Sequence, residues 1–261
     1  MAETKTAIAN KPTWVDLATT DAAAAREFYS KVFGWKIEVN PDPQYGGYGM
    51  GEVGGKRVAG IGPKMSPEAP TAWSIYIATD DADALAKKAQ AAGGTVVAPP
   101  FDVGDQGRMG AIQDPSGAVI SVWQAGAMNS PMPIGEANTF GWAELWARGV
   151  DKALPFYQKL FGWTTKTNDM GPDQPPYYEF ELGGESIAGA QEMQKMVPAN
   201  VPSYWLAYFT VADVDKSFKT ATQAGARELV APMDFPGGRF AIVSDPQGAS
   251  FGLLKMAPAP R

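Results

Sequence analysis

The stretch WVDLATTDAAAAREFYSKVFGW at Trp14–Trp35 recurs as WAELWARGVDKALPFYQKLFGW at Trp142–Trp163, without a gap and at an offset of 128 residues. Nine of the 22 aligned positions are identical, and the identities include FYSKVFGW against FYQKLFGW. Internal similarity at one spacing is the sequence signature of a duplicated structural unit. The chain therefore contains two copies of one module.

Three later matches extend the duplication in the same order. EVGGKRVAG at 52–60 matches ELGGESIAG at 181–189 (offset 129), Trp73 matches Trp205 (offset 132), and the DPSG turn at Asp114 matches DPQG at Asp245 (offset 131). The offset changes by only a few residues, so the copies differ in short loops. We predict a first domain over residues 1–125, a linker rich in Pro, Gly and small residues over 126–141, and a second domain over 142–261.

Each copy has the same predicted order of elements. A strand starting at Trp14 leads into a helix at about 21–33, which Gly34 ends because glycine adopts a positive φ without strain. Strands at 48–53 and 56–61 flank a Gly-Gly turn. A second strand and helix follow at 73–79 and 82–92, with Asp81 as N-cap, and then strands at about 95–98, 108–113 and 118–124.

This order predicts an α+β fold that contains four βαβββ units, two in each copy. The first helix of the second copy contains Pro155. If Asp151 is the N-cap of that helix, the proline falls in the first turn, where its missing N–H has no intrahelical partner to lose.

Composition excludes several classes of function. The chain has 45% hydrophobic residues with 8 Trp, 9 Tyr and 12 Phe, which is enough to fill folded cores. It has no apolar run of about 20 residues and no signal-peptide pattern, so we predict a soluble, cytoplasmic protein that does not span a membrane. A net charge of −6 with scattered Lys and Arg is a poor match for nucleic acid.

The sequence contains no histidine and no cysteine. This removes the commonest transition-metal ligand, the commonest general base, and the cysteine and Ser–His–Asp nucleophile systems. Carboxylates alone would have to hold zinc or iron, and they favour harder ions. We therefore predict that the protein uses no metal and no cofactor.

The four βαβββ units, the FYxxxFGW helix ends and the DPxG turns resemble the vicinal oxygen chelate (glyoxalase/bleomycin-resistance/extradiol dioxygenase) superfamily. Within it, the chain is similar to a two-domain actinobacterial group that includes mycobacterial antigens and proteins labelled hydroxylase. The resemblance covers nearly the whole chain and implies two cupped mixed sheets, each with a metal held on three strands. The implied ligand positions are Trp14, Ser74 and Ser121 in the first copy and Trp142, Leu206 and Gly252 in the second. None of these is a metal ligand, so the chain departs from the family pattern.

Aromatic residues and one acid per copy occupy the implied cup face. The strand period of two places Asp16 with Trp14, and Glu144 and Trp146 with Trp142. The predicted ligand-binding residues are Trp14, Asp16, Tyr76, Trp123, Trp142, Glu144, Trp146 and Tyr208, and the candidate catalytic residues are Asp16 and Glu144. The alternative for the tryptophans is an ordinary place in the core. The acids need water or a partner, because burying an unpaired carboxylate is costly.

Other polar and aromatic residues leave alternatives open. Arg108 and Arg239 each precede a DPxG turn by six residues. They could clamp a ligand carboxylate, pair with the acids on the cup face, or pack their stems as exposed strand residues. Tyr48, Tyr177 and Tyr178 could close over a ligand or cover the sheet.

Three functions fit these observations. The first is metal-independent binding of an aromatic or apolar small molecule, for sequestration, resistance or sensing. The second is a glyoxalase-like lyase, isomerase or oxygenase that acts on a small carbonyl compound through Asp16 or Glu144 as base. The third is an interaction protein whose pocket is vestigial. The expected partner is a small molecule, and the sequence leaves monomer and homodimer open.

Overall fold

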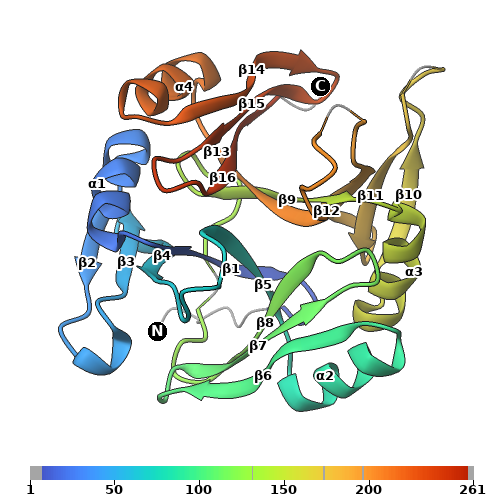
Figure 1. The fold of residues 1–261 in the computed structure, drawn as a ribbon, viewed down its shortest axis with the longest axis horizontal. Coiled ribbons are helices and arrows are strands. Elements are labelled where there is room, and N and C mark those ends of the chain that lie inside the picture. The colour runs from blue at the N-terminus through green and yellow to red at the C-terminus, as the bar shows by residue number, and fades with distance from the viewer. Residues whose placement is uncertain (1–7, 131, 173, 196, 258–261) are drawn as a thin grey trace. The chain divides into compact units, whose positions relative to one another are not determined.

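The computed structural model describes residues 8–130, 132–172, 174–195 and 197–257 (Figure 1). The first copy contains β1 (Pro12–Thr19), α1 (Ala22–Phe33), β2 (Lys36–Val39), the 3-10 turn η1 (Pro43–Tyr45), β3 (Gly49–Val53), β4 (Lys56–Pro63), β5 (Ala72–Ala78), α2 (Ala82–Ala91), β6 (Thr95–Val103), β7 (Gly107–Gln113) and β8 (Val119–Ala125). The second copy contains β9 (Phe140–Ala147), α3 (Val150–Phe161), β10 (Thr164–Asn168), β11 (Tyr177–Leu182), β12 (Glu185–Glu192), β13 (Tyr204–Thr210), α4 (Val214–Gln223), β14 (Arg227–Phe235), β15 (Gly238–Ser244) and β16 (Ser250–Met256). No helix of the described residues is both long and apolar enough to span a membrane.

The strands form two eight-stranded sheets with the same order in both copies. The orders are β2-β3-β4-β1-β5-β8-β7-β6 and β10-β11-β12-β9-β13-β16-β15-β14. β1 pairs with β4 and β5 with β8 in parallel, whereas the outer pairs are antiparallel, so each sheet is mixed. The predicted α+β class and the four βαβββ units are confirmed.

Local sequence accounts for the ends of three helices. The Asp21 carboxylate accepts a hydrogen bond from the backbone N–H of Ala24 at 2.9 Å, and Gly34 ends α1 with a φ of 69°. Asp81 and Asp213 cap α2 and α4 in the same way. Short acidic side chains at this position satisfy N–H groups that have no partner within the helix.

The N-terminus of α3 differs from the prediction. The helix begins at Val150 after Gly149, which has a φ of 85° and provides no side-chain cap. Asp151 therefore lies inside the first turn, and Pro155 is the sixth helical residue. The Glu192 carboxylate at the end of β12 instead accepts hydrogen bonds from the N–H groups of Gly149 and Val150, at 3.0 and 2.8 Å. The sequence prediction missed this cap because the acid is distant along the chain.

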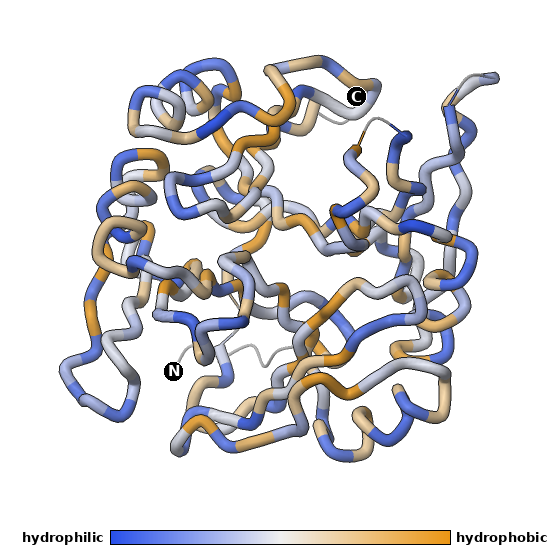
Figure 2. The backbone as a smooth tube through the Cα atoms, in the orientation of Figure 1, coloured by the Kyte–Doolittle hydropathy of each residue, from blue (hydrophilic) through white to orange (hydrophobic). Residues whose placement is uncertain are grey.

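The chain divides into two compact units, and each unit contains parts of both copies. The α2/α3 unit contains the chain up to Trp14, residues 75–130 and Ala143–Trp205. The α1/α4 unit contains Val15–Ser74, Met132–Trp142 and the chain from Leu206 onward. Within each unit the two named helices lie side by side (Figure 1). Hydrophilic residues recur along the turns of α2 and α4 (Figure 2), as expected of helices that bury only one side.

A buried cluster of Tyr29, Asp245 and Trp73 lies in the α1/α4 unit. The Tyr29 hydroxyl donates to Asp245 Oδ2 and accepts from Trp73 Nε1, both at 2.9 Å. Burial, together with the nearby Asp245, raises the pKa of Tyr29 well above its usual range, so the hydroxyl keeps its proton. Burial also raises the pKa of Asp245. The hydroxyl thus satisfies two buried polar groups at once.

The α2/α3 unit repeats this arrangement with Tyr157, Asp114 and Trp205. The Tyr157 hydroxyl donates to Asp114 Oδ2 at 2.8 Å and accepts from Trp205 Nε1 at 2.8 Å. In both clusters the tyrosine belongs to the FYxxxFGW helix of one copy and the aspartate to the DPxG turn of the other copy. The two motifs that recur in the sequence therefore hold the copies together.

Candidate functional site

Adjacent residues of the strands face opposite sides of each sheet, and one of these sides packs against the helices. On β13 the Phe209 ring packs against Phe33 of α1, with ring centroids 5.0 Å apart. The preceding residue, Tyr208, lies over Gly252 of β16, where a Cβ would come within 1.9 Å of Tyr208 Cδ1. Residues of this second kind form what we call the helix-free face of the sheet.

The predicted site residues differ in burial. Trp14, Tyr76, Trp123, Glu144, Trp146 and Tyr208 are buried, whereas Asp16 and Trp142 are half-buried. In the α2/α3 unit, the rings of Tyr76 and Trp123 meet edge to face, with centroids 6.5 Å apart. Most of these aromatic rings therefore pack against the protein itself, as the core alternative predicts. Asp16 is the candidate acid that solvent reaches.

Asp16 lies on the helix-free face of β1 in the α1/α4 unit, and Tyr48 binds to it. The Tyr48 hydroxyl donates to Asp16 Oδ2 at 3.2 Å. Its ring lies across Gly60 and Gly62 of β4, where added Cβ atoms would come within 1.7 and 2.7 Å of Tyr48 atoms. The two glycines are required because no side chain fits beneath the ring. The sequence left two roles open for Tyr48, closing over a ligand or covering the sheet. In the structure its ring covers the sheet.

Glu144 lies at the equivalent place in the second copy, within the α2/α3 unit, but it is only 7% exposed. Its Oε2 accepts a hydrogen bond from Trp146 Nε1 at 2.7 Å. The Trp146 ring lies parallel to Tyr204, with centroids 6.2 Å apart and 9° between the planes. Burial, and then the charge of Glu144, raises the pKa of Tyr204 to about 12. Tyr204 was not among the residues predicted from the sequence. Its alignment with the much smaller Ala72 of the first copy was the signal that could have identified it.

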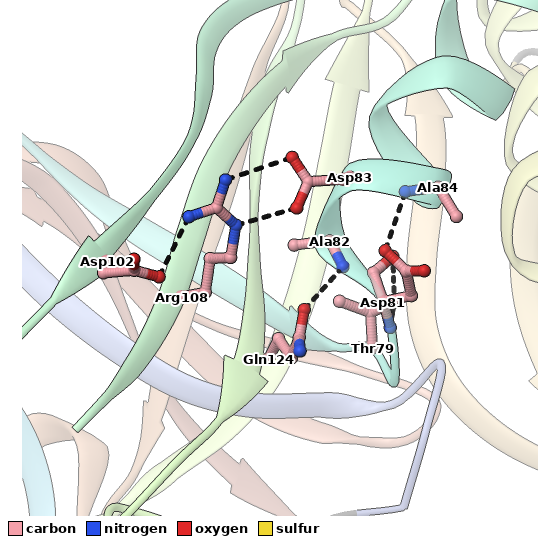
Figure 3. A network of polar contacts seen from close by, with 8 residues as sticks. All are labelled: Thr79, Asp81, Ala82, Asp83, Ala84, Asp102, Arg108 and Gln124. Carbon is pink, nitrogen blue, oxygen red and sulfur yellow. Dashed lines mark hydrogen bonds and ion pairs between the residues drawn. The ribbon is translucent and has the colours of Figure 1, made fainter. Parts of the chain in front are cut away.

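Arg108 does not contact the candidate acids. Its guanidinium binds both carboxylate oxygens of Asp83 on α2, at 2.8 and 3.1 Å, and Asp102 on β6 at 2.9 Å (Figure 3). Arg239 binds two acids in its own unit in the same manner. The hypothesis that these arginines pair with Asp16 and Glu144 is therefore wrong. Each arginine instead links an aspartate in the first turn of a helix to an aspartate on the neighbouring strand. The sequence did not predict these pairs, because the partners come together only in the folded protein.

The Arg108 pair predicts a pH dependence of stability. Its hydrogen bonds lower the pKa of Asp83. A lowered pKa in the folded state means that the ionised carboxylate stabilises the fold above the pKa of the unfolded chain, and that this contribution is lost as pH falls through the folded pKa. We expect Arg108→Met to lower the melting temperature slightly at neutral pH, and to lower it less at about pH 2, because the contribution of the pair declines as the pH falls through the pKa of Asp83 in the folded protein. Melting curves by circular dichroism at both pH values test this; an equal loss at both would contradict it.

The residues of the helix-free face do not fit the metal that the fold family implies. Among the described residues, no group of three or more carboxylates lies close enough together to hold a metal ion, and the sequence has neither histidine nor cysteine. At one implied ligand position, Gly252, the Tyr208 ring covers the strand. The donor set that remains is one carboxylate per copy, each bound by an aromatic donor.

A separate cavity of about 600 Å³ lies in the α2/α3 unit. Its lining consists of Pro172, Gln174, Pro175, Glu192, Met193, Gln194 and Lys195. None of the eight predicted ligand-binding residues belongs to this lining. Because Glu192 also caps α3, the cavity wall contributes to the fold of the helix.

The duplicated fold and the motifs at its centre define the class of protein. The family model for the Glyoxalase/Bleomycin resistance protein/Dioxygenase superfamily matches residues 11–122 and 139–253, and the chain belongs to this superfamily.

Two relatives match over almost their whole length. The chain is 42% identical over 253 residues to "Putative glyoxylase CFP32" of Mycobacterium bovis, covering 95% of each chain. It is 35% identical over 260 residues to "Anthracycline biosynthesis protein DnrV" of Streptomyces peucetius, covering 94% of this chain and 93% of the relative.

Solved structures share the fold at low sequence identity. The Mn(II)-bound glyoxalase from Novosphingobium aromaticivorans has a TM-score of 0.63 at 16% identity, covering 95% of this chain and 84% of that one. The 2,3-dioxygenase LapB from Pseudomonas sp. KL28 has a TM-score of 0.67 at 13% identity, covering 98% and 96%. These likenesses confirm the architecture that the repeats predicted.

Proposed function

We propose that the protein binds a planar aromatic small molecule on the helix-free face, where a carboxylate orients the ligand without a metal ion. The observation that carries this proposal is an acid in each copy held by an aromatic donor, Asp16 by Tyr48 and Glu144 by Trp146. A carboxylate accepts hydrogen bonds from ligand hydroxyl groups, and the aromatic rings offer apolar surface to a flat ligand.

The relatives support one ligand class. DnrV is named as an anthracycline biosynthesis protein, and anthracyclines contain a planar anthraquinone that carries phenolic hydroxyl groups. Such hydroxyl groups are donors of the kind that a carboxylate binds, and the ring system suits an aromatic surface. We therefore propose a hydroxylated polycyclic quinone or a similar phenol as the ligand. Binding without turnover would serve sequestration, resistance or sensing.

A titration tests the proposal. Protein dialysed against EDTA is titrated with quinizarin, a dihydroxylated anthraquinone, and binding is followed by quenching of tryptophan fluorescence. We expect saturable binding that the double variant Asp16→Asn/Glu144→Gln weakens about tenfold or more, because a hydrogen bond to a charged group is lost. Asp42→Asn, at the exposed acid that caps η1, is the matched control. Absence of saturable binding, or binding that requires an added divalent metal, would overturn the proposal.

A second candidate function is a glyoxalase-like lyase, isomerase or oxygenase that acts on a small carbonyl compound. The name of the relative with 42% identity favours it. Asp16 would serve as the base, and its carboxylate accepts a hydrogen bond from the Tyr48 hydroxyl. Turnover of methylglyoxal with glutathione that Asp16→Asn abolishes would favour this candidate over binding alone.

A further inference from the structure

We infer that only the first copy binds the aromatic ligand, at Asp16, and that two aromatic side chains close the equivalent position in the second copy, an inference that rests on the proposed function. The two acids hold the same place in their sheets. Asp16 pairs with Gly60 across β1 and β4, and Glu144 pairs with Gly189 across β9 and β12. These pairs are related by the offsets that align the copies, so the surroundings of the acids can be compared residue by residue.

The second copy covers its acid. Trp146 lies two residues beyond Glu144 on the same face and binds its Oε2 at 2.7 Å. Tyr204 lies parallel to the Trp146 indole, with 9° between the two ring planes. Glu144 retains 7% exposure beneath this cover. A ligand hydroxyl could reach the carboxylate only after Trp146 moved away and its hydrogen bond broke.

The first copy lacks both of these covering side chains. At the position of Trp146 it has Ala18 (offset 128), and at the position of Tyr204 it has Ala72 (offset 132). Both alanines are half-buried, as is Asp16. An alanine side chain ends at Cβ, so neither residue extends over the carboxylate. The Tyr48 ring lies beside Asp16 instead, flat on β4.

This difference assigns separate roles to the two copies. The first copy combines an accessible carboxylate with the Tyr48 ring beside it, which suits the hydroxyl group and the flat face of a phenolic ligand. In the second copy the indole N–H and the ring stack occupy the positions where ligand groups would bind. We therefore expect one ligand per chain.

Stoichiometry and matched variants test the inference. Titration of the full chain with quinizarin is expected to reach saturation at one equivalent. Ala18→Trp, which copies the residue that closes the second site, is expected to weaken binding about tenfold or more. Ala72→Tyr closes the same place from β5 and serves if Ala18→Trp fails to fold. Asp42→Asn, at an exposed acid outside the proposed site, is expected to leave both affinity and stoichiometry unchanged.

The outcomes separate the inference from the proposed function. Two equivalents at saturation, or binding that Glu144→Gln abolishes and Ala18→Trp leaves intact, would overturn the inference while leaving the proposed function in place. No binding to the wild-type chain would overturn the proposed function itself, and the inference with it. One equivalent, lost in Ala18→Trp and retained in Asp42→Asn, supports both.

Discussion

Replacing Tyr157 with phenylalanine is expected to lower the free energy of unfolding by about 3 kcal/mol, because a buried hydrogen bond to a carboxylate contributes about 1.5–3 kcal/mol and a second hydrogen bond, from the Trp205 indole, is lost with it. The hydroxyl donates to Asp114 Oδ2 and accepts from Trp205 Nε1, and both partners lie in the core. Phenylalanine fits the same space but satisfies neither group. Tyr29→Phe should have a similar effect in the other unit, where the same cluster recurs.

Urea unfolding followed by circular dichroism measures this effect. We expect the midpoint to fall while the dependence of the free energy on urea concentration is unchanged, because the folded surface stays the same. Tyr45→Phe removes the hydroxyl of a half-buried tyrosine on η1 and should leave the midpoint unchanged. If Tyr157→Phe and Tyr45→Phe behaved alike, the cluster could not hold the two copies together.

The second large effect is expected at Trp163, the tryptophan that ends the FGW motif of the second copy. Its side chain is 2% exposed, stacks on Tyr157 at 5.7 Å between ring centroids, and donates from Nε1 to the Asn10 carbonyl at 2.7 Å. Trp163→Ala should therefore cost about 3–5 kcal/mol of stability, as buried large-to-small substitutions of aromatic residues do.

The variant Trp163→Phe separates the two contributions. It keeps a ring in the core and loses the hydrogen bond to Asn10, so its loss should be clearly smaller than that of Trp163→Ala. Thermal unfolding by circular dichroism compares the two variants without relying on tryptophan fluorescence. Equal stability of Trp163→Ala and the wild type would show that the FGW tryptophan has no role in the core.

Sequence reasoning succeeded where the structure depends on local chemistry. Asp21 and Asp81 cap helices because a short acid at that position satisfies N–H groups a few residues away. Gly34 ends α1 because it adopts a positive φ. The repeat predicted the equal strand orders of the two sheets, because similar sequences bury the same alternate positions.

The prediction failed where partners come from distant parts of the chain. Glu192 caps α3 from the far end of β12, whereas the sequence near the helix offers only Asp151 as a candidate N-cap. Arg108 finds Asp83 across the α2–β7 packing, although the recurrence of both residues in the second copy was a signal that could have identified them. The sequence also does not show that Tyr29 bonds to the DPxG turn of the other copy, because both copies carry the same motifs.

The candidate site was predicted in part. The period of the strands placed Asp16 and Glu144 on equivalent positions, and the registers with Gly60 and Gly189 agree. The difference in burial between the two acids depends on the direction of a side chain, which the sequence does not give. The Trp146 indole N–H donates a hydrogen bond to Glu144, two residues earlier on the same strand. Alignment of the copies already contained the substitution of Ala18 by tryptophan that produces this closure.

A crystal structure of the full chain, grown with a chelator and quinizarin, shows directly whether Asp16 binds the ligand. We expect one quinizarin on the helix-free face of β1 and β4, with a phenolic oxygen within hydrogen-bond distance of an Asp16 carboxylate oxygen and no metal ion between them. Quinizarin bound at Glu144 or in the cavity beside Met193, with nothing at Asp16, would exclude a ligand site at Asp16.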